Sequence, residues 1–317
     1  MNPISPEQAV QLLRDDQVVA LPTETVYGLA ARISSPLALK RIFTTKERPL
    51  FDPLIVHVQD IHQARQYAAE WPAPLDLLAK TFWPGPLTLV VPKNSKVDPL
   101  ITAGLDTVGL RAPAHPLAQQ ILVHLKEPFA APSANRFGRT SPSRSEHVRH
   151  EFNDQVPVVD GGPCKVGVES TVVRLTTPTR LEVLRPGSVS EQHLAATLKK
   201  DFPQIQITRA VSQASPGHLE QHYQPRLPLV IVHGPDDEKS RLTLKQQYQL
   251  ASSDLIYKLN LSAEAPVAAR ELYHQLHLLS QNPQGLIVYW AGHEWQAPEW
   301  AAVVDRLTRA AQFQFQK

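Results

Sequence analysis

Short apolar runs alternate with segments of 3.6-residue apolar period along this sequence, and that alternation restricts the fold more than any other feature. The helical periods lie at 37–45, 75–82, 117–125 and 143–152. Eight apolar runs predict strands at 18–21, 53–58, 87–91, 108–110, 129–131, 156–159, 171–175 and 181–184. Strands that alternate with helices form α/β sheets, and the helix-free run from 156 to 184 predicts that this sheet is mixed.

Two helix starts are marked by local signals. Ser5 followed by Pro6 combines a capping hydroxyl with a proline at the first helical position. Ser188 and Glu191 have the spacing of a capping box, so we expect a last helix of this part to begin near Ser188 and to end by Phe202.

A change of character after residue 209 predicts a second domain. Residues 210–228 are polar, rich in turn formers and without a period, which is typical of a linker. Beyond them, strands are predicted at 229–232, 255–259 and 286–290, with helices near 238–250, 267–279 and 299–311. We therefore expect an α/β domain at 1–209, a linker at 210–228 and a small α/β domain at 229–317.

Composition excludes several classes of protein. The chain has 317 residues with a net charge of +2, and its single cysteine, Cys164, allows neither an internal disulfide nor a cysteine-based zinc site. No apolar stretch approaches the length of about 18 residues that a membrane span needs, and the first residues lack the features of a secretory signal. We expect a cytoplasmic protein, whose 29 prolines imply many stiff turns.

Basic and hydroxyl side chains recur where predicted strands begin or end. In open α/β sheets ligands bind beyond strand ends, and arginine or lysine beside hydroxyls forms an anion site. Simpler interpretations stay open for each residue. Lys46 and Arg48 suit a helix C-terminus, His57 suits a core, and Arg111 suits an internal ion pair. The acid–base candidates near this basic cluster are Glu24, Asp52, His57 and Glu169.

Familiar catalytic and metal motifs are absent from the sequence. The stretch 161–165 lacks the G-x-x-x-x-G-K-[ST] pattern of a phosphate loop, and no G-x-S-x-G elbow occurs. Two histidine pairs at helical spacing, at 147 and 150 and at 274 and 277, do not sit in an H-E-x-x-H frame. Solvated helix faces explain these pairs better than a metal site does.

Seven motifs in order resemble the YrdC-like domain of threonylcarbamoyl-AMP synthases. They are PTETVYGLAA, KERPLFDPLIVHV, WPGPLTLVV, TAGLDTVGLRAPAHP, AAPSAN, GVEST and VLRPG, between residues 18 and 190. SPGHLEQHYQP, AARELYHQL and DRLTRAA resemble the long form of the family. The resemblance implies a YrdC-like twisted mixed sheet with flanking helices, followed by a small Rossmann-like α/β domain. It also implies a nucleotidyltransferase that makes threonylcarbamoyl-AMP and pyrophosphate from L-threonine, bicarbonate or CO2, and ATP, for the t6A modification at position 37 of tRNA.

The resemblance also implies roles for particular residues. Lys46, Arg48 and Arg111 would be catalytic, with Arg111 meeting the carboxylate of threonine. Threonine would be bound by Thr25, His57, Arg111 and Ser170. ATP would be bound by Lys46, Arg48, Thr107, Ser133, Asn135, Ser141, Arg185, Ser215 and Tyr223. Mg²⁺ would be the cofactor, held mainly by the ATP phosphates, and a downstream threonylcarbamoyl transferase complex would take the product.

Asp52 is one of several departures from the family pattern, and two other functions remain open. Asp52 stands where many members have asparagine before a proline, and a carboxylate there would repel a triphosphate unless it faces Mg²⁺ or solvent. The first alternative function is double-stranded RNA or tRNA binding without adenylate formation, although the near-neutral charge argues against a phosphate-backbone binder. The second is carbamoyl transfer as in hydrogenase maturation, which the single cysteine disfavours because those proteins carry cysteine-rich zinc modules.

Overall fold

A computed structural model describes residues 2–210 and 222–316 of the chain. The chain divides into two compact units, Met1–Phe137 with Pro142–His218 as unit 1, and Gly138–Ser141 with Leu219–Lys317 as unit 2. Ser215, one of the residues expected to bind ATP, lies outside the described residues.

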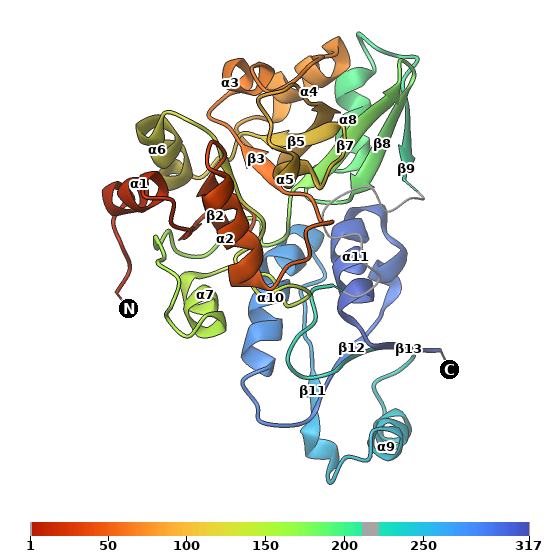
Figure 1. Ribbon diagram of the computed structural model, residues 1–317. Coiled ribbons are helices and arrows are strands. Elements are labelled where there is room, and N and C mark those ends of the chain that lie inside the picture. The colour runs from red at the N-terminus through yellow and green to blue at the C-terminus, as the bar shows by residue number, and fades with distance from the viewer. Residues whose placement is uncertain (1, 211–221, 317) are drawn as a thin grey trace. The chain divides into compact units, whose positions relative to one another are not determined.

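Unit 1 is built on a nine-stranded sheet with the order β1-β2-β6-β3-β5-β4-β7-β8-β9 (Figure 1). Its strands are β1 (Val19–Leu21), β2 (Gly28–Arg32), β3 (Ile55–His57), β4 (Leu87–Pro92), β5 (Thr107–Arg111), β6 (Phe129–Ala130), β7 (Thr171–Thr177), β8 (Arg180–Arg185) and β9 (Gln206–Arg209). Parallel pairs, such as β3 with β5, occur beside antiparallel pairs, such as β4 with β5. The sheet is therefore mixed, and the predicted fold class is confirmed.

One face of this sheet packs against helices. The helices of unit 1 are α1 (Pro6–Arg14), α2 (Pro36–Lys46), α3 (Ile61–Arg65), α4 (Ala73–Phe82), α5 (Pro99–Thr102), α6 (Pro116–Leu125), α7 (Ser145–Glu151) and α8 (Glu191–Leu198). Apolar residues of α2, α3, α4, α5 and α8 form one core cluster with residues of the central strands, among them Val56, Leu89 and Leu110. Burial of such side chains is the main favourable term in folding.

Prolines begin helices as well as turns. Proline occupies the first or second position of α1, α2, α4, α5 and α6 in unit 1. At these positions the missing N–H has no intrahelical acceptor to lose, and the fixed φ suits the helix. The high proline content therefore sharpens the helix boundaries in addition to stiffening the turns.

Three local predictions differ from the structure. Residues 156–159 form only an isolated bridge, between Ala20 and Val158, and no strand. The cap of α8 is Ser190, not Ser188, because the Ser190 side chain accepts from the backbone N–H of His193. Strand β2 is missing from the strands that the sequence predicts, since its small residues carry little β propensity and it forms by pairing with β1.

Unit 2 holds a four-stranded sheet with the order β11-β12-β10-β13, and its strand pairs are all parallel. The strands are β10 (Leu229–His233), β11 (Ile256–Lys258), β12 (Leu286–Trp290) and β13 (Phe313–Gln316). The helices are α9 (Glu238–Gln247), α10 (Ala265–Leu279) and α11 (Ala301–Ala310), with short 3-10 turns η1 (Ser253–Leu255), η2 (His293–Gln296) and η3 (Pro298–Trp300). The three predicted strands and helices are present, and β13 was not predicted.

A short segment from the middle of the chain belongs to unit 2. The backbone N–H of Gln224 donates to the carbonyl of Gly138 at 2.8 Å, and the hydroxyl of Thr140 donates to the carbonyl of Tyr223 at 3.1 Å. His277 contacts the carbonyl of Ser141 through Nε2 at 3.1 Å. Sequence patterns gave no sign of this pairing, because the partners lie more than 80 residues apart.

Candidate functional site

Alternate side chains of the central strands point to opposite faces of the sheet of unit 1. One face belongs to the helix-covered core, and the other, here called the polar face, carries polar side chains beside apolar ones such as Val90 and Val172. Val56 and Leu110 point into the helix-covered core, so their strand neighbours His57 and Arg111 lie on the opposite face. Thr88 shares that face for the same reason, because Leu89 lies in the core. His57 of β3 and Arg111 of β5, which are predicted to bind the substrate threonine, therefore lie on the face of the sheet that is turned away from this core.

His57 and Arg111 are register partners on parallel strands β3 and β5. Both side chains are buried. The His57 ring stacks on Phe129 with ring centroids 5.3 Å apart, and its Nδ1 has no hydrogen-bond partner in the part of the chain that the structure describes. Burial, and then the positive charge of Arg111, lower the pKa of His57 to about 3. His57 is therefore neutral at physiological pH and can accept or donate a hydrogen bond without carrying charge.

Arg111 is anchored on one edge and open on the other. Its Nε donates to the carbonyl of Gly85 at 3.2 Å, and its Nη2 lies 2.6 Å from Oε1 of the buried Glu24. Nη1 has no acceptor among the described residues. A guanidinium held in this way presents N–H groups in the fixed geometry that a carboxylate accepts.

Ser170 is placed by two neighbours. Its hydroxyl lies 2.7 Å from the hydroxyl of Thr88 and accepts from Nη2 of Arg185 at 3.1 Å, while Arg185 Nε donates to the Ser170 carbonyl at 3.1 Å. All three side chains are buried. The structure thus joins Ser170, expected to bind threonine, to Arg185, expected to bind ATP.

Thr25 lies in the loop between β1 and β2 with no exposed surface. Its hydroxyl is 2.8 Å from the hydroxyl of Thr23, which is itself 2.6 Å from the carbonyl of Val26. Since the Thr23 proton goes to that carbonyl, Thr25 donates to Thr23 and keeps its own lone pairs. Thr25 can therefore accept a hydrogen bond from an amine or a hydroxyl group.

Lys46, the last residue of α2, contacts two other residues that are predicted to bind ATP. Its buried ammonium donates to the carbonyl of Ser133 at 2.5 Å and to the carbonyl of Asn135. Desolvation, and then the positive charge of Arg48, hold the pKa of Lys46 well below its usual range. The structure therefore brings Lys46, Ser133 and Asn135 together, and an approaching anion would stabilise the charged form of the lysine.

Arg48 forms a buried ion pair with Asp52, the residue that departs from the family pattern. Nη2 of Arg48 is 2.9 Å from Oδ2 of Asp52, and it also donates to the carbonyl of Pro53 at 2.9 Å. The Asp52 carboxylate therefore faces a cation and offsets its charge. A phosphate that approached Arg48 would meet an arginine already paired with a carboxylate.

Thr107 lies four residues before Arg111 on the same face of β5, with Gly109 between them. Thr107, Gly109 and Thr88 line a small cavity of about 20 Å³. A Cβ on Gly109 would come within 3.2 Å of the Thr88 methyl group. Because Gly109 has no side chain, a flat group can approach this part of the sheet closely.

Two of the residues that are predicted to bind ATP, Ser141 and Tyr223, belong to unit 2. Ser141 is buried there. Tyr223 is also buried, with its ring 5.7 Å from the ring of Tyr273 and the Arg306 guanidinium 5.5 Å from its centroid. The roles of both residues in binding ATP stay predictions.

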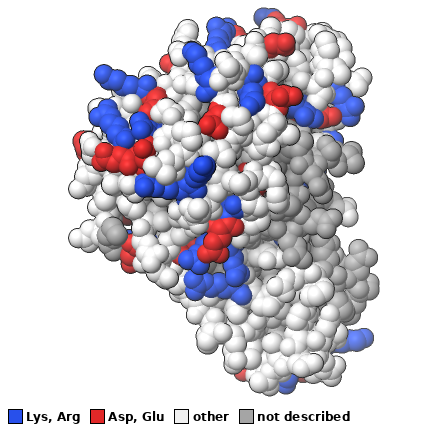
Figure 2. Space-filling view, viewed as in Figure 1, with Lys and Arg blue, Asp and Glu red and all other residues white. Residues whose placement is uncertain are grey.

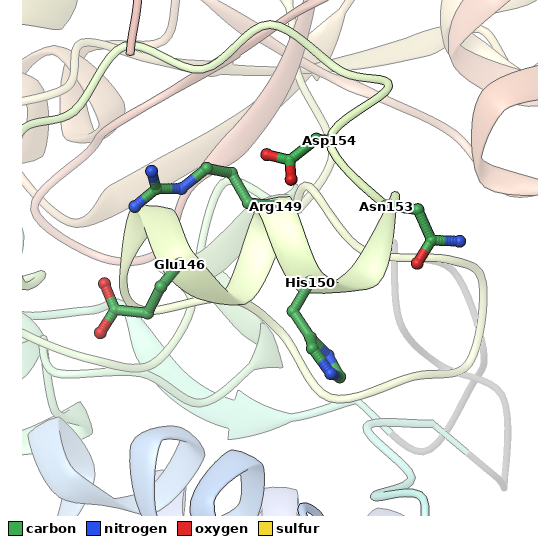
Figure 3. A pocket seen from close by; sticks show the side chains of 5 residues that line it. All are labelled: Glu146, Arg149, His150, Asn153 and Asp154. Carbon is green, nitrogen blue, oxygen red and sulfur yellow. The ribbon is translucent and has the colours of Figure 1, made fainter. Parts of the chain in front are cut away.

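A second hollow, of about 410 Å³, lies on α7 and the turn after it. It is lined by Glu146, Arg149, His150, Asn153 and Asp154. Figure 3 shows these side chains pointing in different directions around the helix, without converging on a common point. This open hollow is therefore a weaker candidate site than the polar face of the sheet.

No metal centre of side chains occurs in residues 2–210 and 222–316, where no three His, Cys, Asp or Glu side chains gather as metal ligands. Cys164 is buried, and desolvation, followed by the charge of Glu24, raises the pKa of its thiol. A thiol of this kind is a poor nucleophile.

Sequence reasoning did not assign several groups to the site. Thr88 lies in the quoted motif WPGPLTLVV, and alternation along β4 could have placed it beside Arg111. Glu24 was noted only as an acid–base candidate, and its pairing with Arg111 joins residues 87 positions apart. Gly85 contributes only its backbone carbonyl, and no sequence pattern predicts such a contact.

Two family models match consecutive parts of the chain. A Sua5/YciO/YrdC family model, described as "Telomere recombination", matches residues 11–187. A second, described as "Threonylcarbamoyl-AMP synthase, C-terminal domain", matches residues 189–312.

Individual relatives match over most of their length. The threonylcarbamoyl-AMP synthase of Bacillus subtilis is 36% identical over 302 residues, which cover 89% of this chain and 86% of the relative. The threonylcarbamoyl-AMP synthase of Pyrococcus abyssi is 41% identical over 240 residues, covering 74% and 69%. The crystal structure of P. abyssi Sua5 complexed with L-threonine has a TM-score of 0.84 and 32% identity, and covers 98% of this chain and 96% of that one.

The fold and these matches define a class, the α/β proteins with a YrdC-like mixed sheet and a small second unit. The resemblance carried by the seven sequence motifs is confirmed. The chain belongs to the threonylcarbamoyl-AMP synthase family. Of the helices that the structure describes, none has both the length and the apolar composition of a transmembrane span.

Proposed function

We propose that this chain makes L-threonylcarbamoyl-AMP and pyrophosphate from L-threonine, bicarbonate or CO2, and ATP, as a nucleotidyltransferase that supplies tRNA t6A modification. The observation that carries the proposal is the buried Arg111 guanidinium, whose Nη1 lacks an acceptor among the described residues and whose register partner is the neutral His57. Family membership and the L-threonine complex of a relative support the choice of amino acid.

The amino-acid end of the reaction uses the polar face of the sheet. We infer that Arg111 accepts the carboxylate of threonine and that Ser170 and Thr25 contact its polar groups. The lone pairs of the Thr25 hydroxyl suit an N–H or O–H donor of the substrate. Fixing both ends of the amino acid would orient its amine for attack on bicarbonate or CO2, which gives a carbamate and, from bicarbonate, one water.

The nucleotide end of the reaction uses the cations at the C-terminal end of α2, Lys46 and Arg48. In this proposal a carbamate oxygen attacks the α-phosphorus of ATP in line, the bond to the β-phosphate oxygen breaks, and pyrophosphate leaves. Lys46 and Arg48 would offset the negative charge of the phosphates, with Ser133, Asn135, Thr107 and Arg185 around the nucleotide. Such chemistry depends on positioning and charge stabilisation more than on covalent catalysis.

We further propose Mg²⁺ as the cofactor. Side chains here fit a cation that is carried by the nucleotide, because Asp52 is already paired with Arg48 and no three His, Cys, Asp or Glu side chains gather as metal ligands among the described residues. When bound, Mg²⁺ would help to neutralise the charge that develops on the phosphates. We also propose a cytoplasmic location and transfer of the product to a threonylcarbamoyl transferase complex, since a mixed anhydride decomposes in water.

An assay of pyrophosphate release tests the proposed function. With ATP and Mg²⁺ present, release is expected only when L-threonine and bicarbonate are supplied together, and threonylcarbamoyl-AMP should appear in equal amount by mass spectrometry. Release that is indifferent to L-threonine would contradict the proposal. Figure 2 shows basic and acidic side chains interspersed on one face of the protein, whereas the RNA-binding alternative calls for a concentrated basic surface.

A further inference from the structure

Glu24 is a buried carboxylate with a donor on each oxygen. Oε1 lies 2.6 Å from Nη2 of Arg111, and Oε2 accepts from the backbone N–H of Ala114 at 3.0 Å. The backbone carbonyl of Glu24 accepts from the N–H of Val166 at 2.8 Å, which fixes the main chain from which the side chain extends. Glu24 is therefore held at both ends, and its geometry is transmitted to Arg111.

The remaining contacts of Arg111 also hold its guanidinium in place. The carbonyl of Gly85 takes Nε, and the backbone N–H of Gly85 in turn donates to the carbonyl of Ala112 at 2.8 Å. Two acceptors, one charged and one neutral, thus fix one edge of the guanidinium. A planar group fixed at two donors cannot rotate, so the direction in which Nη1 points is set.

We propose that Glu24 is a positioning residue for the amino-acid substrate, which aims Nη1 of Arg111 at the substrate carboxylate by holding the opposite edge of the guanidinium. This role rests on the proposed function. Glu24 does not take a proton in the reaction, since both of its oxygens are already occupied by donors.

Glutamine cannot replace Glu24 in this arrangement. One end of a glutamine side chain is an NH2 group, which would face either Nη2 of Arg111 or the N–H of Ala114, and two donors cannot bond each other. Aspartate keeps the charge but is one methylene shorter, so it cannot reach both donors. The two variants therefore break the same geometry while only one of them removes the charge.

The direction in which L-threonine affinity changes distinguishes a role of Glu24 in positioning Arg111 from an effect of its charge alone. If Glu24 acted only through its charge, Glu24→Gln would leave Arg111 more positive and would tighten binding of a carboxylate. If Glu24 acts by holding the guanidinium, both Glu24→Gln and Glu24→Asp weaken binding. We expect the dissociation constant for L-threonine to rise at least tenfold in both variants.

The experiment measures L-threonine binding to the full chain by calorimetry, together with KM and kcat in the pyrophosphate assay. Glu182→Gln is the matched control, because Glu182 also pairs with an arginine, Arg174 at 3.2 Å, on β7 and β8 outside the substrate-binding groups. The expected result is a higher dissociation constant and KM for L-threonine, a KM for ATP within twofold of the parent, and a smaller change in kcat than in KM. If Glu24→Gln does not yield folded protein, Glu24→Asp decides in the same assays.

The outcomes distinguish this role from the proposed function. L-threonine binding in the variants that equals or exceeds that of the parent would overturn the positioning role alone. An equal rise of the KM for threonine and for ATP would also overturn it, because general structural damage acts on both. A parent protein that binds no L-threonine would overturn the proposed function and this role together.

Discussion

His57 lies directly opposite Arg111 across the parallel pair β3 and β5, and the two side chains together define the electrostatics of the polar sheet face. The pKa of His57 is about 3 because burial, followed by the charge of Arg111, disfavours the imidazolium. Arg111 therefore remains the cation at this position, and its neighbour contributes a neutral ring. An anionic substrate group is directed to the arginine.

The depressed pKa of His57 predicts how stability depends on pH. In the unfolded chain a histidine binds its proton near its ordinary pKa of about 6.5, whereas folded His57 does so only near 3. Between these values the unfolded state holds more protons, so the free energy of unfolding falls as pH falls, by at most about 1.4 kcal/mol per pH unit from this group. Above about 6.5 this contribution is constant.

Chemical unfolding of the parent and of His57→Asn between pH 7 and pH 4 measures this slope. The variant should lose stability less steeply on acidification than the parent does. His124→Asn, at an exposed histidine of α6, is the control for general effects of a histidine-to-asparagine change. Parallel pH profiles for the parent and His57→Asn would contradict the assignment.

Arg111→Lys tests whether the site requires a planar guanidinium. Lysine retains the charge. It cannot bond Glu24 and Gly85 along one edge and still offer a further N–H group to the substrate, as the planar guanidinium does. A hydrogen bond to a charged group is worth about 1.5 to 3 kcal/mol, so we expect kcat/KM for L-threonine to fall by about tenfold or more. The KM for ATP should stay near that of the parent.

A surface replacement controls for general effects of an arginine-to-lysine change. Arg174→Lys, on β7 with a side chain 30% exposed, should leave kcat/KM for both substrates unchanged. A kcat/KM for L-threonine in Arg111→Lys within threefold of the parent would remove Arg111 from the amino-acid site.

Thr88→Val tests the hydroxyl that contacts Ser170. Valine has nearly the same shape but cannot bond the Ser170 hydroxyl 2.7 Å away. One lost hydrogen bond is worth about 0.5 to 1.5 kcal/mol, so the KM for L-threonine should rise by about two- to tenfold. Thr81→Val, at an exposed threonine of α4, provides the control, and equal KM values in both variants would argue against this contact.

The sequence allows prediction of the strands that carry the site but not of how its side chains pair. Alternation along 107–111 puts Thr107, Gly109 and Arg111 on one face, and the apolar neighbours identify the other face as core. The pairing of Glu24 with Arg111 joins a loop to a strand 87 residues away, which no local pattern encodes. Family motifs supplied candidate residues, whereas the contacts that orient them came only from the fold.

Errors at the element boundaries have a common physical cause. Residues 156–159 read as an apolar strand, yet their burial comes from packing with residues such as Tyr27 and Val148, without a continuous ladder. Helix α8 begins two residues later than expected because two serines compete for the cap, and Ser190 also gains a contact with the His193 side chain at 3.0 Å. Tertiary contacts decided both cases over local propensity.

Tyr223 is a structural anchor of unit 2, whatever its role toward ATP. Its ring is 1% exposed and packs against Tyr273 and Arg306. Removing a buried aromatic ring costs about 3 to 5 kcal/mol, so Tyr223→Ala should lower the unfolding midpoint clearly, while Tyr223→Phe should lower it much less. Equal midpoints for the parent and Tyr223→Ala in chemical unfolding would contradict this anchoring role.

The lowered pKa of Lys46 predicts that ATP binding is coupled to proton uptake. Desolvation and the charge of Arg48 hold the pKa of Lys46 well below its usual range, and a triphosphate placed beside the ammonium would raise it again. At a pH below the ordinary pKa of lysine, ATP binding should therefore take up at most one proton per site from the buffer. Calorimetric titrations in buffers of different ionisation enthalpy measure that number. Arginine does not titrate in this range, so Lys46→Arg should abolish the buffer dependence. Equal buffer dependence in the parent and the variant would show that the proton goes to another group.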